Sequence, residues 1–176
     1  SNFIIKGESF DVSRIINNIM DNEDESSTIF ENLNSRIKIN IKKTYIDEVN
    51  YVNNLYGNID FNNNKINDLK LESTFPNDKK INMSIKTNNN SETTTRLFSG
   101  YPKPLIKRYN FIKGFEEGYL DFYSSKKGKI SNSVLVIDNF KVKEVPVFAK
   151  LLSLASLQGI ADLLTGEGIR FTDFEM

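Results

Sequence analysis

The segment RIKINIKKTY (residues 36–45) alternates apolar and polar side chains with a period of two over its first seven positions. Ile37, Ile39 and Ile41 fall on one side of an extended chain, and the arginine, lysine and asparagine residues around them fall on the other. This alternation is typical of a β-strand with one face against apolar material and one face in water. The segment therefore predicts an amphipathic strand.

The same alternation returns in the segments 49–61, 69–75 and 81–85. Asn62-Asn63-Asn64 and Pro76-Asn77-Asp78 separate these segments with residues that favour tight turns. Consecutive strands joined by short turns pair as antiparallel hairpins by default. We predict a long, curved antiparallel meander with one apolar face, lined by Ile37, Ile39, Ile41, Val49, Tyr51, Leu55, Ile59, Phe61, Leu69, Leu71, Phe75, Ile81, Met83 and Ile85.

The segments on either side of the meander predict a mixture of strands and short helices. Residues 3–6 are an apolar run suited to an opening strand, and residues 12–20 carry apolar side chains at the spacing of one helix face. Residues 95–98 predict the start of a short helix that Pro102 and Pro104 interrupt. Farther on, residues 118–123 predict a strand and residues 126–128 a turn.

The C-terminal segment SVLVIDNFKVKEVPVFAKLLSLASLQGIADLLTGEGIRFTDF (residues 133–174) predicts a strand, an apolar helix, a glycine turn and a second strand. Pro146 suits the first turn of the helix, and Gly166 or Gly168 can end it. Lys150, Gln158 and Asp162 make it a poor membrane span. We expect it to cover the apolar face of the sheet through Phe148, Leu151, Leu152, Ala155, Ile160 and Leu163; an interfacial or partner-binding helix is the alternative.

Several short motifs in this segment occur together in one known group of proteins. They are Asn139-Phe140 at the end of the strand, Val145-Pro146, the Leu/Ala/Ser-rich helix with Gly159-Ile160, and GEGIRF at residues 166–171. With them, the segment resembles the AsmA-like C-terminal region of the AsmA/YhdP/TamB superfamily of bacterial envelope proteins. A looser resemblance extends upstream through residues 7–11 and 109–119. The resemblance implies a scaffold without a catalytic motif.

Composition narrows the possible functions. The chain has 176 residues, enough for one domain with a substantial core, and we interpret residues 1–176 as a single domain. The 23 basic and 23 acidic residues balance, so no overall field attracts nucleic acid. With no cysteine and no histidine, the chain lacks thiolate ligands and the commonest general base. Because it ends inside an expected strand, we interpret it as part of a larger protein.

The charged and glycine-rich motifs do not indicate catalysis. Asp47-Glu48 and Glu116-Glu117 are adjacent pairs that point to opposite faces of a strand, so neither converges. The acidic run 21–25 lacks the glycine and the bidentate glutamate of a calcium loop. The turn 165–168 follows a helix, whereas a phosphate loop precedes one. Lys126, Lys127 and Lys129 have the charge to contact phosphate, although a solubilising hairpin edge is the commoner role. We expect no catalytic residue, no metal and no cofactor.

A continuous apolar face must be covered by helices or form an open trough, and the pattern alone leaves both open. The resemblance implies the trough: an inner-membrane-anchored, periplasmic β-groove protein that helps carry phospholipid between the inner and outer membranes. Its partners would be phospholipid acyl chains and other segments of the same parent chain, with no nucleic acid and no membrane span in residues 1–176. The alternatives are a structural or protein-binding envelope domain with a closed core and, less favoured, a hydrolase of envelope polymers.

Overall fold

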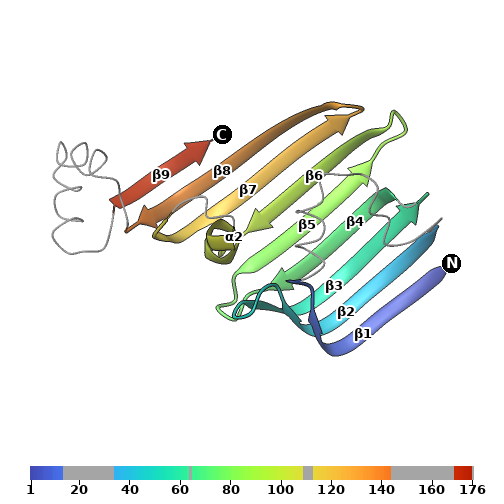
Figure 1. Ribbon diagram of the computed structural model, residues 1–176, viewed down its shortest axis with the longest axis horizontal. Helices are drawn as coiled ribbons and strands as arrows, with labels where there is room; N and C mark the ends of the chain where they lie inside the picture. The colour runs from blue at the N-terminus through green and yellow to red at the C-terminus, as the bar shows by residue number, and fades with distance from the viewer. Residues whose placement is uncertain (14–33, 64, 109–112, 144–168, 176) are drawn as a thin grey trace. The chain divides into compact units, whose positions relative to one another are not determined.

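The structure is a computed structural model that describes residues 1–13, 34–63, 65–108, 113–143 and 169–175 (Figure 1). Across these residues, nine strands follow one another in the hydrogen-bonded order of the chain, with β1 and β9 at the two ends of the order. Helix α2 (Lys103–Arg108) is short. The prediction of a mainly β protein built on a meander sheet is therefore confirmed.

The strands are long, and those that follow β1 pair mostly as the sequence predicts. They are β1 (Asn2–Asp11), β2 (Ser35–Tyr45), β3 (Tyr51–Asn62), β4 (Lys65–Thr74), β5 (Lys80–Thr87), β6 (Glu92–Ser99), β7 (Phe115–Lys127), β8 (Ile130–Val142) and β9 (Ile169–Glu175). Antiparallel pairing joins β2 to β3, β3 to β4, β4 to β5 and β8 to β9. Strand β1 instead runs parallel to β2, so the default of antiparallel pairing is wrong at this step. Parallel neighbours need a long connection, and residues 12–34 provide it.

The chain folds into two compact units, which we describe separately. Unit 1 comprises Ser1–Phe98 and Tyr123–Ser133, and unit 2 comprises Ser99–Phe122 and Val134–Met176. That residues 1–176 form a single domain stays a prediction.

Tight turns connect the strands of unit 1 where the sequence predicts them. Asn62 pairs with Lys65, and Asn63 has a φ of 47°, the left-handed conformation that asparagine tolerates. Asp78 has a φ of 61° and donates its backbone N–H to the carbonyl oxygen of Phe75 at 3.0 Å. Residues 95–98 lie in β6, so the helix predicted there is wrong. The β-branched run 93–95 favours a strand.

Unit 2 has a core of stacked aromatic rings. The rings of Phe115 and Phe140 stack at 5.4 Å between centroids, and those of Phe140 and Phe171 at 5.1 Å. Phe171 pairs directly with Phe140 across β8 and β9, so the strand predicted at residues 169–174 is confirmed. Helix α2 carries Pro104 in its first turn; the prolines begin this helix and do not end it.

Two predicted helices lie outside the described residues. They are the helix over residues 12–20, of which only Val12 and Ser13 are described, and the covering helix over residues 146–164 with its six apolar contacts. Both stay predictions. Where the structure describes the chain, it contains no helix with the length and hydropathy to cross a bilayer.

Candidate functional site

Cross-strand pairing in unit 1 brings the predicted apolar side chains together in rows. Paired residues on neighbouring strands project from the same face of a sheet, so the register decides which side chains share it. The first row, the Ile37 row, contains Phe3, Ile37, Ile59, Leu69 and Ile85. The second, the Ile39 row, contains Ile5, Ile39, Gly57, Leu71 and Met83. We call the side that carries both rows the apolar face.

Further predicted residues flank the two rows. Ile41 pairs with Leu55 next to the Ile39 row, and Ile81 pairs with Ser73. Phe61 pairs with Ile66 through a register shift between Asp60 and Phe61, which turns Ile66 to the side of Phe61. Strict alternation along β4 places Ile66 on the face opposite to Leu69 and Leu71, so the sequence pattern did not predict Ile66 as a member of the apolar face.

Two predicted members do not belong to the apolar face. Val49 lies in the loop between β2 and β3 and is 77% exposed, because β3 begins only at Tyr51. The loop is held by the carboxylate of Asp47, whose Oδ1 accepts the backbone N–H groups of Val49 at 2.9 Å and Asn50 at 2.7 Å. The assignment of Val49 to this face is wrong, because the side chain of Asp47 stabilises a loop at this point and Val49 is therefore not part of a strand.

Tyr51 is displaced by a bulge in β3. Gly57 pairs with Leu71 but Asn53 pairs with Thr74, and the odd spacing from Leu71 to Thr74 puts Asn53 on the opposite side of the sheet from Gly57. Asn54, between them, has a φ of 54°. Tyr51, two residues from Asn53, is therefore on the opposite side too, and its assignment to the apolar face is wrong.

The reversal of phase brings a different residue into the core and gives Tyr51 a polar neighbour. Val52 is buried, at 3% exposure. The Nζ atom of Lys43 lies 3.9 Å from the ring centroid of Tyr51, a cation–π contact.

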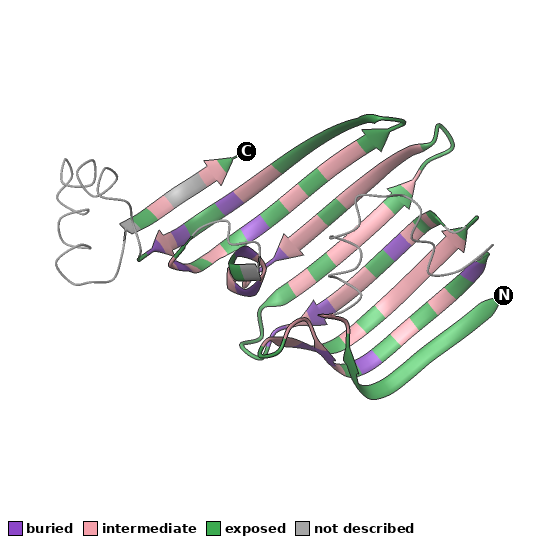
Figure 2. Ribbon diagram, in the orientation of Figure 1, coloured by how far each residue is buried: buried purple, intermediate pink, exposed green. Residues whose placement is uncertain are grey.

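Most of the apolar face keeps some contact with solvent. Ile41 and Leu69 are buried, at 3% and 6% exposure, and the other row members on β2 to β5 are half-buried (Figure 2). On β1, Phe3 is 51% and Ile5 44% exposed. Phe75, which follows the end of β4, is fully buried. The apolar face is therefore a partly exposed surface of aliphatic and aromatic groups.

The opposite side of β2 to β4 carries cross-strand polar pairs. Arg36 donates to both carboxylate oxygens of Asp60, from Nε at 2.8 and 3.0 Å and from Nη2 at 2.7 Å, and these bonds lower the pKa of the Asp60 carboxyl. The hydroxyl of Tyr56 donates to Glu72, and Lys70 Nζ lies 2.9 Å from the same carboxylate, so the pKa of Glu72 is lowered too. These pairs keep this side of the sheet hydrated.

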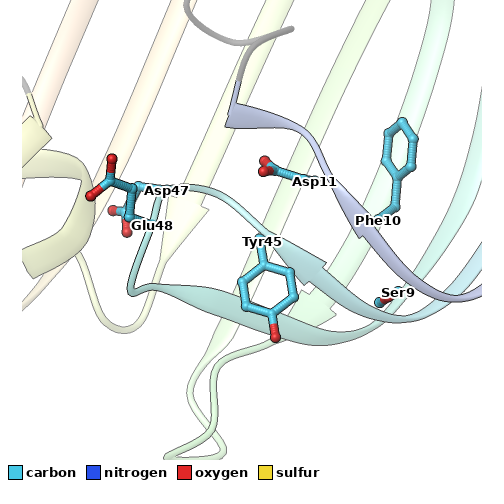
Figure 3. A pocket seen from close by; sticks show the side chains of 6 residues that line it. All are labelled: Ser9, Phe10, Asp11, Tyr45, Asp47 and Glu48. Carbon is cyan, nitrogen blue, oxygen red and sulfur yellow. The ribbon is translucent and has the colours of Figure 1, made fainter.

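A hollow of about 490 Å³ lies at the C-terminal ends of β1 and β2 (Figure 3). Its lining residues are Ser9, Phe10, Asp11, Tyr45, Asp47 and Glu48. The view shows the carboxylate of Asp11 apart from those of Asp47 and Glu48. Asp11 accepts the backbone N–H of Ser13 at 2.8 Å, and Asp47 caps its own loop. The carboxylates of Asp11 and Asp47 therefore serve local backbone structure.

The second carboxylate pair, in unit 2, also diverges. Glu116 lies 3.3 Å from Lys103 and 3.0 Å from Lys143, which lower its pKa. Glu117 contacts Arg170 at 2.8 Å and Lys141 at 3.1 Å, and its pKa is lowered mainly by Arg170. Both glutamates are ionised and form ion pairs with different basic side chains. They therefore do not converge on a common point, as a pair of catalytic carboxylates would. Among the residues that the structure describes, no group of three or more acidic side chains is placed to hold a metal ion.

No family model, curated protein or solved structure matches this chain. The AsmA-like resemblance of residues 133–174 therefore stays a prediction, and the functional argument depends on the geometry of unit 1.

Proposed function

We propose that the apolar face of unit 1 holds lipid acyl chains, and that the chain is a non-enzymatic segment of a periplasm-spanning, inner-membrane-anchored protein that helps carry phospholipid between the inner and outer membranes. The observation that carries this proposal is the alignment of apolar side chains from five consecutive strands in the Ile37 row. Such a row presents a continuous hydrocarbon surface with no polar side chain between its members.

The size of a row suits an acyl chain. Neighbouring strands lie about 4.8 Å apart, so five strands span roughly 19 Å across the sheet. One leaflet of a bilayer has a hydrocarbon thickness of about 15 Å. An extended acyl chain that lies along a row leaves water for apolar contacts. This transfer is favourable by a free energy of about 0.8 kcal/mol per methylene removed from water. This contact lowers the cost of moving a lipid tail through an aqueous compartment, and no bond is made or broken.

The envelope setting rests on the resemblance of residues 133–174 to the AsmA-like region. On that basis, an anchor in the inner membrane lies in another part of the parent protein, and further segments of the same kind extend the apolar face. Phospholipid supplies the acyl chains. The proposal needs no cofactor and assigns no catalytic residue.

A structural or protein-binding role within the envelope is the second candidate. Unit 2 favours it, because Phe115, Leu120, Ile137, Phe140 and Val142 are all buried at 6% exposure or less. These residues form an ordinary closed core. On this alternative, the apolar face of unit 1 is also covered, by protein and not by lipid.

Lipid extraction and native mass spectrometry of the purified protein distinguish the two. We expect co-purified phospholipid with the wild-type chain and a clear loss with Ile39→Asn combined with Met83→Asn, which place polar groups in the Ile39 row. The matched control is Lys38→Asn combined with Ser84→Asn, at neighbouring positions of the same strands on the opposite face. A wild-type protein free of lipid, or equal lipid in both double variants, would contradict the proposal.

A further inference from the structure

The tip of the β7–β8 hairpin has an unusual combination of exposed groups. Strand β7 ends at Lys127 and β8 begins at Ile130, so Gly128 and Lys129 form the turn, in which Gly128 has a φ of 59°. Every residue from 126 to 130 is exposed. Ile130 is 70% exposed, although isoleucine is among the side chains most often buried. Lys127 and Lys129 precede it on β7 and in the turn.

The turn between β5 and β6, beside this tip, adds no acidic side chain. The carboxylate of Glu92, at the start of β6, accepts hydrogen bonds from Ser125 Oγ at 2.6 Å and Asn88 Nδ2 at 3.2 Å, and the charge of Lys127 also lowers the pKa of Glu92. The adjacent turn between β5 and β6, residues 88–91, consists of three asparagines and a serine. These turn residues carry no charge, and Glu92 is one carboxylate against the three lysines at residues 126, 127 and 129, so the tip keeps an excess of positive charge.

The opposite ends of the unit 1 strands have the reverse character. Asp47 and Glu48 lie in the loop between β2 and β3, Asp78 lies in the turn between β4 and β5, and Asp11 ends β1. Lys79 and Lys80 lie at this same end, so unit 1 has a basic β7–β8 tip at one end of its strands and, at the other, these four carboxylates against two lysines. A surface that attracts the first end repels the second, which gives orientation as well as attraction.

We propose that residues 126–130 form a docking point for an anionic lipid bilayer surface. The ammonium groups of Lys127 and Lys129 contact lipid phosphates, while the side chain of Ile130 enters the interface between headgroups and acyl chains. Basic residues beside an exposed apolar side chain are the chemistry by which peripheral proteins bind such surfaces. This docking does not require that the apolar face carry lipid.

Vesicle flotation tests the proposal. The probes are vesicles of phosphatidylcholine alone and of phosphatidylcholine mixed with phosphatidylglycerol. We expect the wild-type chain to float with the anionic vesicles only, and more weakly as salt is raised, since salt screens exposed charges. A lysine near an anionic surface contributes about fivefold to partitioning, so Lys127→Gln combined with Lys129→Gln reduces binding roughly 25-fold. Ile130→Ser reduces it by about tenfold.

The matched control is Lys79→Gln combined with Lys80→Gln, which removes the same charge at the opposite end of the strands. Its flotation should equal that of the wild type. Equal losses in both double variants, flotation independent of salt, or binding to single-stranded DNA without binding to vesicles would each overturn the proposal. The salt series requires only the wild-type protein, so it tests the proposal even if the variants fold poorly. Because co-purified lipid is measured without vesicles, failure of docking and failure of lipid carriage are separate results.

Discussion

The backbone carbonyl oxygen of Lys70 lies 1.8 Å from the position that a Cβ atom on Gly57 would occupy. Gly57 is the one member of the Ile39 row without a side chain, and the approach of β4 to β3 at this point depends on its absence. The glycine thus has a structural role within the apolar face.

Substitution of Gly57 should therefore destabilise unit 1. We expect Gly57→Ala to reduce the free energy of unfolding by about 3 kcal/mol, because the backbones of β3 and β4 must separate locally. Urea denaturation followed by circular dichroism measures this change. Gly7→Ala is the control: its Cβ would meet only the Ser9 carbonyl oxygen at 3.8 Å, and we expect an effect near zero. Equal stability of the two variants would contradict the role assigned to Gly57.

The aromatic stack of unit 2 provides a second stability prediction. Phe140 lies between Phe115 and Phe171 and is 3% exposed. Phe140→Ala leaves a cavity and removes both ring contacts, which should cost about 4 kcal/mol in the free energy of unfolding. Phe140→Leu fills part of the cavity and should cost about half as much, roughly 2 kcal/mol. Comparable losses in both variants would contradict a large contribution from the cavity and would assign the loss to the ring contacts, which both variants remove.

The ion pair between Arg36 and Asp60 predicts a pH dependence. Hydrogen bonding from Arg36 lowers the pKa of Asp60 below its ordinary value of about 3.9. A lowered carboxyl pKa contributes stability that is complete above the ordinary value and disappears as the pH falls through the lowered one. A ¹³C NMR titration of the Asp60 carboxyl should show the low pKa in the wild type and a return toward the ordinary value in Arg36→Gln. An unchanged titration in the variant would contradict the pairing.

The cap on the loop between β2 and β3 provides a third stability prediction. Asp47 accepts two backbone N–H groups through Oδ1, so Asp47→Ala leaves both without their partner. We expect a loss of about 1–2 kcal/mol, measured by thermal or urea unfolding, and a smaller loss for Asp47→Asn, which retains a carbonyl acceptor. The neighbouring Glu48→Ala serves as the control and should leave stability unchanged. A Glu48 effect as large as that of Asp47 would argue against the cap.

The sequence was informative wherever alternation and turn chemistry acted together. Ile37, Ile39 and Ile41 predicted the period of β2, and the asparagines at 62–64 predicted the hairpin that aligns Ile59 with Leu69. These are local features, because side-chain direction in a strand follows from position alone.

The predictions that were wrong, for Tyr51, Val49 and the pairing of β1, failed for physical reasons that lie outside the local pattern. The left-handed residue Asn54 reverses the phase of β3 near Tyr51, and no composition rule requires a bulge there. The Asp47 cap removes Val49 from the strand. The parallel pairing of β1 joins Phe3 to the Ile37 row, and this partner is set by tertiary contacts that alternation does not encode.

Site-specific photocrosslinking tests most directly whether the apolar face contacts lipid. A photoreactive amino acid replaces either Ile39 or Lys38, which are adjacent in β2 and project from opposite faces, and the protein is irradiated with phospholipid present. We predict a covalent lipid adduct at position 39 and little or none at position 38. No adduct at position 39, or equal adducts at both positions, would contradict lipid binding on this face.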